Sequence, residues 1–142
     1  MRVAHSTVAR RLDAAPPLAR AAALSGLDGN LPFLSVIEEH EELPEIQWIH
    51  GLFPRRCPAL RLSTTLALRA AAMAGMGIAA LPRYVGLGAP GLNEIMPPSP
   101  APLESLFLVT HREQCGLARL RVLIDDLPQV VAADQALFGG NA

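Results

Sequence analysis

Apolar and polar positions along this chain alternate with a helical period in some stretches and a strand-like period in others. The clearest helical pattern lies near the C-terminus, where apolar side chains recur every three or four positions at Leu117, Leu120, Ile124, Leu127 and Val131. Pro128 interrupts that pattern, and its missing N–H predicts that the helix ends or kinks there. A second helical piece is then expected over residues 129–137.

Shorter patterns predict the remaining elements. Helices are expected at residues 8–12, 18–24, 46–52 and 64–74, with a Pro-Pro pair separating the first two. Apolar runs predict strands at residues 1–9, 33–37, 59–62, 77–81 and 106–110. Loops are expected at residues 26–30, 38–45 and 96–102, the second as an exposed, glutamate-rich segment. Because strands alternate with helices, the sequence predicts an α/β fold with at least one partly parallel sheet.

The most informative segment is residues 62–86, where a strand end leads through hydroxyl side chains into a helix. Such hydroxyls can cap a helix and leave its free N–H groups directed at a ligand; they belong to Ser63, Thr64 and Thr65. Gly75 suits a left-handed helix end, and the apolar run 78–81 is typical of a strand covered on both faces. The segment therefore predicts a small-anion site, with plain helix capping as the alternative.

This segment resembles the effector-binding domain of LysR-type transcriptional regulators, a family that shows a Ser/Thr-led helix followed by Gly-x-Gly-Ile-x-x-Leu-Pro. Here that pattern reads Gly75-Met76-Gly77-Ile78-Ala79-Ala80-Leu81-Pro82. The resemblance continues in order through residues 92–97, 106–112 and 117–127. Upstream, Trp48 and the charged stretch before it resemble a loop of the same domain, although a tryptophan beside Ile46 and Ile49 is more often local core than pocket lining.

The resemblance implies an α/β, periplasmic-binding-protein-like fold with one near-complete lobe and the C-terminal part of the other. It places residues 1–76 in the second lobe, and residues 77–138 in the crossover strand and the first lobe. Residues 139–142 are expected to form a flexible tail. The family's winged helix-turn-helix has no counterpart here, so the resemblance implies a C-terminal fragment, a truncated product or a misassigned start.

The resemblance also implies a ligand. In the family, a small molecule binds between the lobes, and hydroxyl groups at this helix start contribute to the cleft. Carried onto this chain, the ligand-binding residues are expected to be Ser63, Thr64, Thr65, Leu66, Gly77 and Ile78. A small anionic metabolite is the expected ligand, and no cofactor is expected.

Composition narrows the function classes. With 51% hydrophobic and 18% charged residues, the chain can form a core, and its net charge of −1 gives no electrostatic case for nucleic acid. Its basic residues are all arginine, and the pairs Arg10-Arg11 and Arg55-Arg56 are interpreted as solvated surface. No membrane segment and no signal peptide are recognised, so reduced thiols and a cytoplasmic location are expected.

Other candidate chemistry is weak. Residues 86–91 match Gly-x-Gly-x-x-Gly, but no helix is expected to follow, so a glycine-rich turn is the better interpretation. Metal ligands would have to be drawn from the scattered set His40, His50, Cys57, His111 and Cys115, which lacks two tight pairs. The carboxylates of 38–45 and 125–126 show no catalytic arrangement. No metal site and no enzyme activity are predicted.

The leading hypothesis is therefore an effector-sensing domain, or a remnant of one, that lacks a DNA-binding winged helix and does not bind DNA directly. One alternative is a solute-binding protein of transport with the same architecture, against which the missing signal peptide counts. Another is an interaction protein that pairs with an intact regulator subunit. Self-association is expected both for an effector-sensing domain and for an interaction protein of this family, because strands 92–96 and 106–110 would offer unpaired sheet edges.

Overall fold

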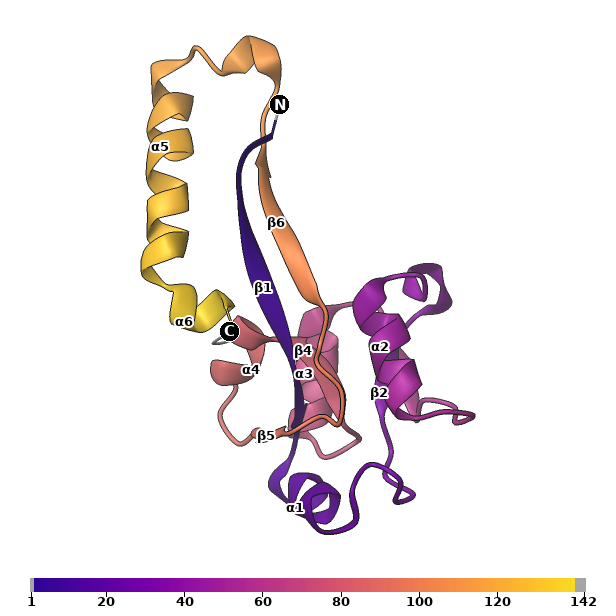
Figure 1. Ribbon diagram of the computed structural model, residues 1–142. Coiled ribbons are helices and arrows are strands. Elements are labelled where there is room, and N and C mark those ends of the chain that lie inside the picture. Colours follow the sequence, from indigo (N-terminus) through magenta and orange to yellow (C-terminus); the bar gives the residue numbers. More distant parts are fainter. Residues whose placement is uncertain (1, 140–142) are drawn as a thin grey trace. The chain divides into compact units, whose positions relative to one another are not determined.

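The computed structural model describes residues 2–139, with side chains described at 7–37 and 39–139. The chain forms two compact units (Figure 1). Unit 1 combines the chain up to Ala9 with the chain from Leu103 onward, and unit 2 is Arg10–Pro102. The expected division between residues 76 and 77 differs from this one, because the strand that follows Gly77 pairs inside unit 2.

Unit 2 is built around a mixed sheet. Its strands are β1 (Arg2–Ala14), β2 (Leu34–Val36), β3 (Leu60–Leu62), β4 (Ala79–Pro82) and β5 (Asn93–Ile95). β2 is parallel to β3, and β1 is antiparallel to both β4 and β5. A parallel bridge between Phe33 and Ile78 joins the two groups, with Leu34 N donating to Ile78 O at 2.8 Å. The resulting order is β3–β2–β4–β1–β5.

Helices cover both faces of this sheet. They are α1 (Pro16–Ser25), the short 3-10 turn η1 (Glu38–His40), α2 (Pro44–Leu52), α3 (Thr65–Met73) and α4 (Arg83–Leu87). One core cluster joins α1 and α2 to the sheet through buried side chains that include Ala22, Ile49 and Phe33. The second joins α3 and α4 to the opposite face through side chains that include Leu68, Val85 and Leu34. Alternate residues of each strand thus serve alternate cores.

Unit 1 contains the remaining elements. Residues Arg2–Ala9 of β1 pair antiparallel with β6 (Leu103–Val109), and the chain continues through η2 (Arg112–Gln114), α5 (Ala118–Ala133) and α6 (Gln135–Phe138). Of the two outcomes predicted for Pro128, an end or a kink, the helix does not end there, because α5 continues to Ala133. A proline removes one i→i−4 hydrogen bond, which a helix of this length can lose without ending.

Several predicted elements were confirmed, among them the strands at β2, β3 and β6 and the helices α2 and α3. The helix expected at residues 8–12 was wrong: those residues extend β1, because pairing with β4 and β5 outweighs local preference. The strand that includes Pro82 leads directly into α4, a helix that the sequence analysis missed. Glu45, expected in an exposed loop, is buried in the first turn of α2.

Candidate functional site

The candidate site lies where the parallel strands of unit 2 end. β2, β3 and β4 run in one direction, so their last residues, Val36, Leu62 and Pro82, share one edge of the sheet. Antiparallel β1 begins its pairing with β4 at the same edge, where Arg10 is opposite Pro82. We call this the strand-end edge. In open α/β sheets, ligands bind outside the carboxyl ends of the parallel strands.

The hydroxyl-bearing segment follows β3 at this edge. Thr64 is the N-cap of α3, with extended backbone angles, and its Oγ1 accepts a hydrogen bond from Ala67 N at 3.1 Å. Ser63 and Thr64 are exposed, Thr65 is half-buried and Leu66 is exposed. The helix capping expected for this segment is therefore present, and two hydroxyl side chains remain accessible from solvent.

Gly77 and Ile78, by contrast, lie inside the core. A Cβ on Gly77 would meet Leu34 Cγ and Cδ2 at 3.0 Å and Pro32 O at 3.2 Å. Close approach, not a positive φ, therefore explains this glycine, whereas Gly75 adopts the expected left-handed φ of 77°. Ile78 is fully buried, and its backbone N donates to Pro32 O at 2.9 Å. The sequence segment thus brings four candidate residues to the surface and two to the core.

An ion pair that sequence reasoning missed also lies at the strand-end edge. Arg10 Nη2 donates to Glu45 Oε1 at 3.0 Å, and both side chains are about nine-tenths buried, with exposed fractions of 10% and 9%. Glu45 is in the first turn of α2, where a carboxylate is favoured by the helix dipole. Nearby, Arg61 Nη1 pairs with the Glu41 carboxylate. The only signal in the sequence was the arginine pair itself, and its interpretation as solvated surface was wrong for Arg10.

A second charged cluster lies on the other face of β1. Arg11 Nε and Nη2 donate to Asp13 Oδ1 at 2.9 and 2.6 Å, and Arg11 Nη1 lies 3.4 Å from Glu94 Oε2. Arg11 and Asp13 are both buried, so the interpretation of Arg11 as solvated surface was wrong. Burial raises the pKa of the Asp13 carboxyl above its ordinary value, more than the Arg11 hydrogen bonds lower it, and Glu94 adds to the rise.

The weaker motifs form no site. In the described part of the chain, no group of three or more His, Cys, Asp or Glu side chains is placed to hold a metal ion. The segment 86–91 ends α4 and turns at Gly91 into β5, so no helix N-terminus follows it to receive a pyrophosphate. His50 Nε2 lies 2.9 Å from Ser35 Oγ, and Ser35 is buried under α2. Trp48 packs against the core cluster of α1 and α2, and its Nε1 donates to Ser99 Oγ at 3.2 Å.

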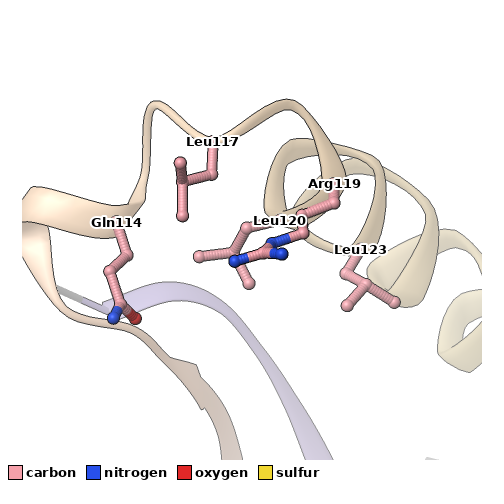
Figure 2. A pocket seen from close by; sticks show the side chains of 5 residues that line it. All are labelled: Gln114, Leu117, Arg119, Leu120 and Leu123. Carbon is pink, nitrogen blue, oxygen red and sulfur yellow. The ribbon is translucent and has the colours of Figure 1, made fainter.

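A pocket of about 260 Å³ lies in unit 1, at the start of α5. Figure 2 shows the side chains that line it, from Gln114 of η2 to Leu123 in the second turn of the helix. The lining is mostly leucine, and Arg119 supplies its one charged side chain. This lining contains no acid–base pair and no nucleophilic side chain. The strand-end edge is therefore the stronger candidate for a functional site.

Comparison with known proteins agrees with this architecture. A search of curated protein sequences returned no match. The regulatory domain of CrgA, a LysR-type transcriptional regulator from Neisseria meningitidis, superposes with a TM-score of 0.63 at 17% identity, over 91% of this chain and 68% of that domain. The C-terminal domains of a LysR family protein from Agrobacterium tumefaciens give 0.60 at 21% identity, over 97% and 67%.

These similarities establish the class of fold, a LysR-type regulatory domain with a periplasmic-binding-protein-like architecture. The family model for the LysR substrate binding domain matches residues 31–132, which is most of the chain, so the chain belongs to that family. It spans 45% of the CrgA chain in a second CrgA structure. No helix in the described part is long and apolar enough to cross a membrane.

Proposed function

We propose that this chain senses a small anionic metabolite as the effector-binding part of a LysR-type regulator, in the cytoplasm and without binding DNA itself. The observation that supports the proposal is the composition of the strand-end edge. An N-capped helix with accessible hydroxyls at Ser63 and Thr64 shares this edge with the guanidinium of Arg10. Hydroxyls, free helix N–H groups and guanidinium groups are the donors that carboxylates and phosphates favour.

In this proposal unit 2 is the second effector lobe, and the ligand-binding residues are Ser63, Thr64, Thr65 and Leu66, with Gly77 and Ile78 shaping the backbone behind them. The mechanism is a population shift. An effector that binds one conformation more tightly moves the equilibrium toward it, by no more than its difference in affinity. In a regulator, the shifted state changes how linked DNA-binding domains are presented. No observation favours the transport alternative.

A second candidate role, self-association or pairing with an intact regulator subunit, is favoured by the surface of unit 1. α5 has no buried residue, and the exposed apolar side chains of α5 and β6 include Val122, Val130, Leu103 and Val109. β6 pairs only with β1 among the strands described. Exposed strand edges beside apolar side chains favour association.

The effector proposal is tested by thermal unfolding against a library of small carboxylates, with Thr64 as the variable position. A ligand that binds only the folded chain raises its melting temperature. Thr64→Asp keeps an N-cap acceptor but adds a negative charge, so the variant should fold like the parent and lose the response. Thr64→Ser should keep both the stability of the parent and its rise in melting temperature with the ligand. If no carboxylate raises the melting temperature of the parent, or if Thr64→Asp responds like the parent, the proposal is wrong.

A further inference from the structure

We propose that Arg10 is the principal anion-binding residue of the strand-end edge, and that Glu45 occupies it as an internal carboxylate until an anionic effector takes its place. This inference rests on the proposed function. It adds that Arg10 binds the effector and that the Glu45 carboxylate competes with the effector for Arg10. The Arg10–Glu45 pair joins β1 to the first turn of α2, two elements that both reach the strand-end edge.

The location of Arg10 follows from the strand register. Because β1 is antiparallel to β4, Arg10 is opposite the last residue of β4, Pro82, and the same strand's Leu12 faces the core that α1 and α2 cover. Arg10 and Leu12 are two positions apart, so both side chains lie on the face that carries α2. A guanidinium is thereby fixed at the carboxyl ends of the parallel strands, the position at which α/β sheets bind ligands.

The chemistry of the pair explains why it is a candidate for exchange. An arginine that is nine-tenths buried needs an anionic partner, because an uncompensated charge there is strongly destabilising. Glu45 supplies that partner through its carboxylate, the group that a carboxylate effector would also offer. An effector carboxylate can form the bidentate pairing that arginine favours, which the contact to Glu45 Oε1 does not.

The contrast with Arg11 supports the assignment. Arg11 is held by Asp13 on its own strand and by Glu94, on the face that α3 and α4 cover, and Asp13 is fully buried. That pair is part of the core, where Gly86 of α4 packs directly against it. Arg10 instead pairs across two elements at the edge, with a partner from the start of a helix. Neighbouring arginines in the sequence thus have different roles.

The experiment measures the response of the whole chain to sodium succinate, sodium benzoate and sodium sulfate at constant ionic strength, by thermal unfolding and isothermal titration. Glu45→Gln removes the competing charge and should tighten binding of the responding anion about tenfold, equivalent to ~1.4 kcal/mol. Arg10→Gln should abolish binding. Glu41→Gln breaks the other ion pair near this edge and should leave affinity unchanged.

A second measurement keeps the test independent of how well the variants fold. The Nε–Hε resonance of Arg10 in the parent chain, assigned with Arg10→Lys, should shift on addition of the responding anion. If the parent binds an anion in a Thr64-dependent way but Glu45→Gln binds with unchanged affinity and the Arg10 resonance stays fixed, this inference is overturned and the proposed function stands. If no anion acts on any folded variant, the proposed function itself fails.

Discussion

Gly86 lies directly against the buried carboxylate of Asp13. A Cβ on Gly86 would overlap Asp13 Oδ2, and it would also lie 2.9 Å from Nε and 3.0 Å from Cδ of Arg11. Because Gly86 has no side chain, the Arg11–Asp13 pair can pack directly against the backbone of α4. Gly86 belongs to the segment 86–91, which the sequence analysis interpreted as a glycine-rich turn, and its role is in core packing within α4.

Gly86→Ala should destabilise the chain strongly. The new methyl group has to displace a hydrogen-bonded carboxylate inside the core, so we expect a loss of about 3 kcal/mol in the free energy of unfolding. Urea unfolding monitored by circular dichroism is the measurement. Gly51→Ala is the matched control, because nothing lies within 4 Å of its added Cβ and its position in α2 favours alanine over glycine. Equal stability of the two variants would contradict the packing role.

Gly77→Val should lower the melting temperature clearly. Its Cβ would already meet Leu34 at 3.0 Å and the carbonyl of Pro32 at 3.2 Å, and the branched methyl groups add to that crowding. Overpacking of this kind costs about 1–3 kcal/mol. Differential scanning calorimetry on the variant, with Gly116→Val as a control at an open position, checks the prediction. A variant that melts with the parent would show that β2 can move away from Gly77.

Asp13 should make stability depend on pH in a defined direction. Its folded-state pKa is raised, so the folded chain holds the Asp13 proton more tightly than the unfolded chain does. The associated stabilisation is complete below the unfolded pKa of about 3.9 and is lost as the pH rises through the folded pKa. Relative to Asp13→Asn, which cannot titrate, the parent should lose stability as pH increases over this window. Urea unfolding of both proteins across this pH range tests the prediction. If the parent instead gains free energy of unfolding relative to Asp13→Asn as the pH rises, the prediction is contradicted.

The chain should self-associate through unit 1. Val109 on β6 is 66% exposed, and a charge there should weaken association without disturbing a core. Light scattering over a dilution series should show the parent above its monomer mass and Val109→Glu closer to it. Leu24→Glu is the control, since Leu24 is also apolar and is still more exposed, at 85%, but lies on α1 of unit 2. A parent that is monomeric at every concentration would refute the prediction.

The chain should not bind promoter DNA in a sequence-specific way. Its net charge of −1 supplies too little favourable phosphate interaction. Gel-shift assays at moderate salt are the measurement, and a discrete band that survives excess competitor DNA would contradict the expectation.

The sequence by itself determined the elements whose information is local. The hydroxyls of Ser63 and Thr64 predicted the start of α3 because an N-cap acts on backbone N–H groups only two or three residues away. Gly75 predicted the left-handed helix end for the same reason. The order of these motifs carried the family resemblance, and with it the class of fold.

Tertiary structure decided what depends on pairing between distant segments. Residues 8–12 became part of β1, and Arg10 and Arg11 took opposite faces of it, because β4 and β5 supply hydrogen-bond partners about 70 to 80 positions later. The same pairing placed Arg10 beside Glu45 and buried Asp13 against Gly86. Strand pairing is non-local and a one-residue change of register reverses which side chains are buried, so no local pattern could assign these contacts.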